Sequence, residues 1–169
     1  MRFLWENGAL ALIELLHGQR RLSPLGIHSA LRVVNSLALD RDLLEEALAE
    51  TGLVPCIVPF VGASWITSIR LEAMRFVHAL CTHSGKTRHI FFTCLGVPHL
   101  AHALEDVQHI RADTLERRAI ARLAVDAIWT LINSGTGNLP GVSRLLVDAG
   151  LVPSLLRGLH LLEEGKDSS

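Results

Sequence analysis

Aromatic side chains are scarce in this chain, and tyrosine is missing altogether. Of the 169 residues, 5% are aromatic and 49% are hydrophobic, with leucine and alanine dominant among the hydrophobic ones. Sheets favour aromatic and β-branched residues, whereas leucine and alanine are strong helix formers. The composition therefore predicts an all-α fold.

An excess of one charge sign is also lacking, since the chain has 16 basic and 17 acidic residues. Such a chain has no overall field that would attract nucleic acid or an anionic membrane. It has no apolar run of membrane-spanning length, and Glu6 and Asn7 interrupt the apolar start too early for a signal peptide. We therefore expect a cytoplasmic protein with no nucleic-acid and no membrane partner.

The three cysteines do not form an even set, and each lies within an apolar run. Cys56, Cys81 and Cys94 are therefore expected to be buried free thiols in a reducing compartment.

Motifs that would support catalysis or metal binding are missing. His99 and His102 share a helical spacing, but no CxxC pair accompanies them, as a structural zinc site would require. The loop 134–141 lacks the Gly-Lys-Ser/Thr ending of a phosphate loop, and no serine lies in a Gly-x-Ser-x-Gly elbow. We expect no catalytic residue, metal or cofactor; a metal-dependent enzyme using the histidines is the alternative.

An internal repeat organises the chain. Segments 7–16, 51–61, 94–104 and 149–159 align when Ala11, Pro55, Pro98 and Pro153 are superimposed. The first two spacings fall in the range of roughly 40–47 residues that is typical of armadillo and HEAT repeats. The third is longer and requires an insertion, which we place at 105–118.

Each unit repeats the same order of elements. A short amphipathic stretch (43–50, 88–94 and 143–149) is followed by a Gly, then by a helix with Pro near its start. A longer helix with apolar residues at helical spacing closes the unit, at 27–39, 68–81 and 119–133, and Ser68 is the expected N-cap of the second. This order predicts an armadillo/HEAT-like right-handed helical solenoid of about three to four repeats over residues 1–163, with a solvated tail at 164–169. An irregular helical bundle is the alternative.

The exposed apolar residues at the start of the chain indicate the interior of a longer array, because free-standing solenoids carry polar caps.

The run RLAVDAIWTLINSGTGNLPGVSRLLVDAGLVPSLLRGLHLL (122–162) carries a more specific signal, above all its Ala-Val-Asp-Ala-Ile-Trp segment at 124–129. Together with the runs at 51–62 and 72–106, it resembles the armadillo-like C-terminal region of fungal septation-initiation and mitotic-exit kinases and of plant MAP kinase kinase kinase epsilon. The kinase domain of that family lies N-terminal to the repeats, and this chain shows no Gly-rich loop, His-Arg-Asp run or Asp-Phe-Gly. The resemblance implies a non-catalytic, regulatory repeat module that acts in the cell cycle.

For such a module the resemblance implies docking, autoregulation or dimerisation through exposed end repeats. It also implies recruitment to a scaffold or a small GTPase at the spindle pole body or division site. The alternative is a peptide-groove adaptor of importin or catenin type, which uses an asparagine ladder on its third helices. The aligned rung here is Asn35, His78 and Thr130, of which only the first is an asparagine, and this departure argues against that alternative.

Five other residues are candidates for partner contacts. Arg32 and Arg75 lie three residues before the rung in successive units, where a pair of arginines could hold acidic groups or phosphate; solvated helix charges are the alternative. Arg111 and Arg117 belong to the charged insertion, and such insertions often contact partners. Trp65, in a connection, is either a contact residue or packed under the next helix. Asp126 is expected to pair with Arg122 one helical turn earlier.

Overall fold

The computed structural model describes residues 2–18, 22–39, 52–83, 85–94, 96–107, 109, 114–133, 144, 147–148 and 150–163. Within those ranges every regular element is a helix, which confirms the all-α prediction. The elements are α1 (Arg2–His17), α2 (Pro24–Leu37), α4 (Leu53–Ile57), the 3₁₀ helix η2 (Val58–Val61), α5 (Thr67–His83), α6 (Gly85–Thr93), α7 (Gly96–Val107), α8 (Thr114–Asn133) and α10 (Leu151–Glu163).

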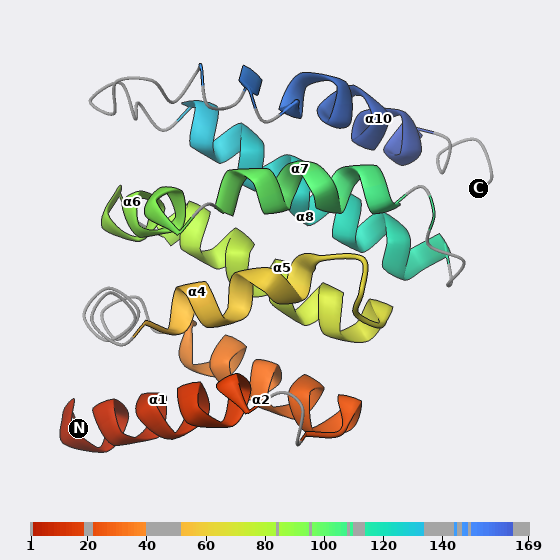
Figure 1. The fold of residues 1–169 in the computed structure, drawn as a ribbon. Helices are drawn as coiled ribbons and strands as arrows, with labels where there is room; N and C mark the ends of the chain where they lie inside the picture. Colours follow the sequence, from red (N-terminus) through yellow and green to blue (C-terminus); the bar gives the residue numbers. More distant parts are fainter. Residues whose placement is uncertain are drawn as a thin grey trace.

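The helices stack in two rows (Figure 1). One row consists of α1, α4 with η2, α7 and α10, and each of these contacts the next. The second row consists of α2, α5 and α8, with α5 packed between the other two. None of the described helices is both long enough and apolar enough to cross a membrane.

The predicted order of a left-handed glycine followed by a helix with proline near its start is present in two of the units. Gly52 and Gly150 precede α4 and α10 with φ angles of 72° and 67°, the left-handed region that glycine adopts without a Cβ clash. Pro55, Pro98 and Pro153 are each the third residue of a helix, where a missing N–H costs no intrahelical bond. The unit that contains α7 does not follow this pattern. Its Gly96 is required for a different reason, because a Cβ there would lie 2.1 Å from the Phe91 ring.

Helix starts differ from the sequence expectations in several places. Pro24 opens α2 because Ser23 caps it, its hydroxyl oxygen accepting a bond from the Gly26 N–H at 3.2 Å. The predicted N-cap at Ser68 is wrong, because the Ile66 carbonyl already accepts the first helical bond of α5, from the Arg70 N–H at 3.1 Å. Helices α6 and α8 begin earlier than predicted, at Gly85 and Thr114.

Helix α8 therefore takes up the end of the predicted charged insertion, and α7 takes up its beginning. The short helix expected at 43–50 and the tail at 164–169 lie outside the described residues, as does most of 143–149.

One apolar core runs through both rows. Its largest fully buried side chains include Phe60, Phe76, Phe91 and Met74. A charged residue is buried with them, since Arg70 is only 3% exposed. Its Nε donates to the Val61 carbonyl at 3.1 Å and its Nη2 lies 3.9 Å from the Asp106 carboxylate, so that it links α5 to η2 and α7. Burial lowers the pKa of this guanidinium, and Asp106 opposes the shift.

All three cysteines are free thiols, as predicted. Cys56 and Cys81 are buried, whereas Cys94 is only partly so. Cys81 lies in α5 with no exposed surface, and burial raises the pKa of its thiol far above the ordinary value.

Candidate binding groove between α2 and α5

A groove of about 470 Å³ lies between α2 and α5. Four residues predicted from the sequence lie in its lining: Arg32, Asn35, Arg75 and His78. The lining also includes Glu72 and His83 from α5 and Leu123 from α8. Side chains that are far apart in the sequence therefore meet at one joint of the second row.

The apolar pattern of α2 explains which of its residues reach this groove. Ile27, Ala30, Leu31 and Val34 form the buried face of the helix. Residues at the edge of such a face lie beside the neighbouring helix, because positions three and four apart share one side. Asn35, next to Val34, is half-buried there, and Arg32 is exposed one turn earlier.

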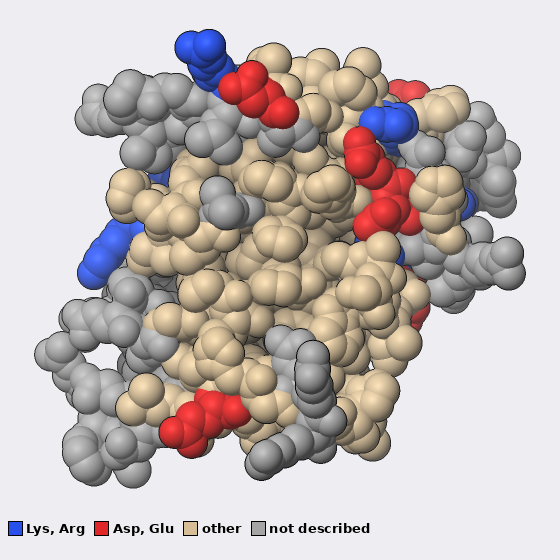
Figure 2. All heavy atoms as spheres, viewed as in Figure 1, with Lys and Arg blue, Asp and Glu red and all other residues tan. Residues whose placement is uncertain are grey.

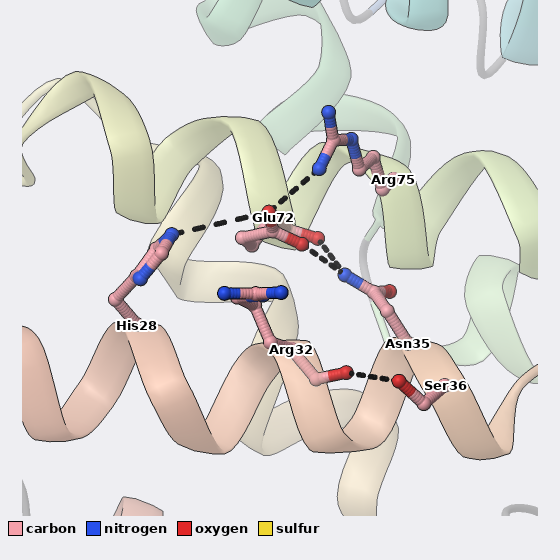
Figure 3. Close-up of polar contacts among 6 residues, drawn as sticks. All are labelled: His28, Arg32, Asn35, Ser36, Glu72 and Arg75. Carbon is pink, nitrogen blue, oxygen red and sulfur yellow. Dashed lines mark hydrogen bonds and ion pairs between the residues drawn. The ribbon is translucent and has the colours of Figure 1, made fainter.

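Glu72 is the centre of the polar contacts in the groove (Figure 3). It is only 6% exposed, although it carries a charge. Asn35 Nδ2 donates to its Oε2 at 2.8 Å and to its backbone carbonyl at 3.0 Å. Arg75 Nη1 donates to Oε1 at 2.6 Å, and His28 Nε2 lies 3.9 Å from the same oxygen. A buried carboxylate requires such partners, since an unpaired one would be strongly destabilising.

Arg32 differs from Arg75 in its partners. Its backbone carbonyl accepts a bond from the Ser36 hydroxyl at 3.0 Å, but its guanidinium makes no ion pair with any described carboxylate (Figure 3). The groove therefore holds one arginine that is already neutralised by Glu72 and one whose charge is available.

His78 extends the lining towards α8. Burial lowers the pKa of its imidazole below the ordinary value, the Asp126 carboxylate opposes this shift, and His83 adds to it. The neutral ring can donate from one nitrogen and accept at the other.

The remaining predicted contact residues lie elsewhere. The Thr130 hydroxyl donates to the Asp126 carbonyl one turn before it on α8. Trp65 is partly buried and packs on Phe60 of the preceding helix η2, with ring centroids 4.7 Å apart. Arg117 is half-buried in the first turn of α8, and Arg111 lies outside the described residues. Arg122 Nε lies 3.9 Å from the Asp126 carboxylate, so the predicted pair is present.

The histidines of the metal alternative do not converge with further ligands in the described part of the chain. No group of three His, Cys, Asp or Glu side chains there is arranged to hold a metal ion. His99 is half-buried, which lowers its pKa, whereas His102 is exposed and lies 3.6 Å from the Glu105 carboxylate.

Sequence reasoning missed two residues. Glu72 was not singled out, although a carboxylate on the apolar side of a helix, between Ile69 and Ala73, is an available signal. Trp129 ends the Ala-Val-Asp-Ala-Ile-Trp segment, and it is 64% exposed on α8, with the exposed Ile132 three residues on. Large exposed apolar side chains of this kind are common in contact surfaces.

The all-helical chain, with its groove and exposed tryptophan, is homologous to a region of protein kinases that lies outside the kinase domain. Those kinases are the plant MAP3K epsilon protein kinases. The chain is 30% identical over 166 residues to MAP3K epsilon protein kinase 2 of Arabidopsis thaliana, 27% over 165 residues to MAP3K epsilon protein kinase 1 of Brassica napus, and 28% over 165 residues to MAP3K epsilon protein kinase 1 of Arabidopsis thaliana.

Each of these alignments covers 96% of the chain but only 11–12% of the kinase. The chain thus spans about a ninth of the length of these relatives. No protein-family model matches it, and no solved structure matches it either.

Proposed function

We infer that the chain is a non-catalytic protein-interaction module of the kind that regulates a serine/threonine kinase of the MAP kinase kinase kinase type. Its single strongest support is Trp129, which is 64% exposed on a helix whose opposite side is fully buried. Tryptophan is enriched among the residues that dominate protein–protein binding energy, and exposing it to water is otherwise unfavourable. The homology to kinase regions outside the kinase domain agrees with a regulatory role.

The proposed architecture is an armadillo-like right-handed solenoid. The contacts of each helix with the next in both rows support it, as do the left-handed glycines before α4 and α10. Solenoids offer long surfaces to partners, which suits docking of a scaffold, a small GTPase or the kinase domain itself. The fungal resemblance extends the proposal to the cytoplasm, at the spindle pole body or division site, in septation and mitotic exit.

Exchange of the matched region in Arabidopsis thaliana MAP3K epsilon protein kinase 2 tests the function. Removal of the region should leave phosphoryl transfer to a generic substrate intact but deplete the proteins that co-purify with the kinase. Insertion of this chain should restore those proteins, and a chain with Trp129→Ala should not. Loss of phosphoryl transfer on removal, or an unchanged set of co-purifying proteins, would contradict the proposal.

The matched control for Trp129→Ala is Val33→Ala. Val33 is also an exposed apolar residue in the second row, but on α2. Circular dichroism of both variants should show unchanged helix content, because neither side chain is part of the core.

Self-association is a second candidate function, favoured by α10. Val152, Leu156 and Leu159 are exposed on it at i, i+4 and i+7, which is one apolar stripe. The face that α10 shares with α1, α4 and α7 carries few charged side chains among the described residues (Figure 2). Light scattering should then report a dimer that Leu156→Glu dissociates. A monomer at high concentration would exclude this candidate.

A peptide-groove adaptor of importin or catenin type has less support. Its asparagine must be free to hold a peptide backbone with both donor and acceptor. Here the Asn35 amide nitrogen is committed to Glu72 by two bonds. The other rung positions are His78 and Thr130, and the Thr130 hydroxyl is bonded within its own helix.

A further inference from the structure

The groove between α2 and α5 has an unbalanced charge. Glu72 and Arg75 neutralise each other through the contact of 2.6 Å, and Asn35 occupies the second carboxylate oxygen. Arg32 is left as the one side chain with an unpaired formal charge in the described lining, when the histidines are neutral. Such a cleft favours a ligand that brings one negative charge.

Both arginines line the groove, and both keep N–H donors for an anionic ligand. Arg75 uses Nη1 for Glu72, and a guanidinium has five N–H donors, so several remain. Arg32 and Arg75 extend from facing helices towards the Glu72 cluster (Figure 3). Glu72 holds Arg75 in place, which reduces the entropy lost when a ligand binds.

Part of the lining is apolar. Leu39 is 83% exposed two residues after the last residue of α2, and Ala79 of α5 and Leu123 of α8 line the same groove. A ligand that covered Leu39 would remove a large apolar side chain from water. The lining of one groove therefore holds both a charged side chain and apolar side chains.

We propose that this groove binds a short acidic segment of a partner protein, with an Asp or Glu carboxylate received by Arg32 and Arg75 and a neighbouring apolar side chain placed on Leu39, Ala79 and Leu123. The assignment rests on the interaction function inferred above and names the chemistry of the partner at one surface.

A carboxylate fits better than a phosphate because of Glu72. A phosphorylated side chain carries about −1.5 to −2 charges at neutral pH, more than the one available positive charge. Its surplus would face the buried Glu72 carboxylate, a like charge that cannot move away while Asn35 and Arg75 hold it.

Three pools of ten-residue peptides test the assignment, each with random flanks and a fixed central pair: Glu-Leu, Gln-Leu or phosphoserine-Leu. Binding to the full chain is measured by biolayer interferometry at neutral pH. The Glu-Leu pool should bind about fivefold more tightly than the Gln-Leu pool, the effect of one charge-assisted contact at a partly exposed site. Arg32→Gln should abolish that difference, and Arg32→Lys should retain part of it.

The matched control is Arg122→Gln, which removes an arginine with a 77% exposed side chain from α8, outside the groove lining. It should leave the preference for Glu-Leu unchanged. Equal binding of the Glu-Leu and Gln-Leu pools, absence of binding by every pool, or a preference that survives Arg32→Gln would overturn the assignment. A stronger preference for phosphoserine-Leu would overturn the choice of a carboxylate.

The kinase exchange separates this assignment from the general function. A kinase that carries the chain with Arg32→Gln should lose the partners that depend on the groove. If it keeps all of them while removal of the region depletes them, the groove assignment fails and the interaction function stands. If removal depletes nothing, the interaction function fails.

Discussion

Helix α5 has a neighbour on each side in its row, and the two joints differ in chemistry. The buried side of α8 carries Ala121, Ala124 and Ala127 beside Ile128, all without exposed surface. Small side chains let helix axes approach closely, and the α5–α8 contact is the most extensive in the described structure. The α2–α5 joint instead places Asn35 against the buried Glu72 and leaves a groove.

The difference indicates a division of roles within one row of helices. The apolar joint contributes stability, because burial of apolar surface is the main favourable term in folding. The polar joint contributes less stability but presents donors, acceptors and charge to a ligand. Substitutions at the two joints should therefore separate stability from binding.

The largest effect is expected from Ile128→Ala at the apolar joint. Removal of the fully buried side chain should lower the free energy of unfolding by about 2–5 kcal/mol, since it leaves a cavity in a closely packed core. Urea unfolding followed by circular dichroism measures it. Ile132→Ala on the exposed side of α8 is the control and should cost less than about 1 kcal/mol. Equal losses would mean that α8 is not anchored by its buried face.

A smaller effect is expected from Glu72→Gln at the polar joint. The amide keeps the shape of the side chain but gives Arg75 a neutral partner and brings N–H donors against those of Asn35. The free energy of unfolding should therefore fall by about 1–3 kcal/mol. Arg75 then joins Arg32 as an available charge. The preference among the peptide pools should shift towards phosphoserine-Leu.

Glu105→Gln is the comparison for that substitution. Its side chain is 44% exposed, and it pairs with Arg157 at 3.2 Å on the surface, so its loss should change the free energy of unfolding by less than about 1 kcal/mol. A loss as large as that of Glu72→Gln would show that the buried carboxylate contributes no more to stability than the exposed one.

Acidification should destabilise the folded chain through His78. Burial holds the pKa of His78 in the folded chain below its ordinary value of 6.5, so below that pH the unfolded chain binds the proton more readily. At pH values well above 6.5, His78 therefore leaves the free energy of unfolding unchanged. The free energy of unfolding falls as the pH drops through 6.5. The urea midpoint should therefore fall less for His78→Gln than for the unaltered chain between about pH 7.5 and about pH 5.5.

The lowered pKa of His99 acts in both proteins and cancels in that difference. An identical fall for the two proteins would show that His78 is not the group responsible.

The smallest effect is expected from Arg122→Gln. Its ion pair with Asp126 spans 3.9 Å between side chains that are 77% and 51% exposed. Exposed pairs contribute little because water and salt screen them, so the change in the free energy of unfolding should be under about 0.5 kcal/mol. A larger loss would mean that α8 depends on its outer face as well as on its apolar one.

Local signals made much of the fold predictable from the sequence. Pro55, Pro98 and Pro153 marked helix starts, and Gly52 and Gly150 marked left-handed turns, because each acts through its own backbone. The exact first residue of a helix was less predictable. Ser68 has the chemistry of an N-cap, yet α5 begins before it.

The groove was predictable only in part. Aligning the repeats placed Arg32, Asn35, Arg75 and His78 on one side of the stack, and all four line the groove. What the sequence did not reveal is that Asn35 meets Glu72, 37 residues away. That contact depends on how α2 and α5 pack, and nothing in the local pattern of either helix encodes it.

The buried thiol of α5 has a practical consequence for following this molecule in solution. Cys81 has no exposed surface, and the thiolate that reacts with alkylating and disulfide reagents is disfavoured there because burial raises its pKa. Its labelling therefore requires the helix to leave the core. The rate of modification at Cys81 therefore reports how often α5 opens around this residue, and mass spectrometry can measure it without any introduced probe.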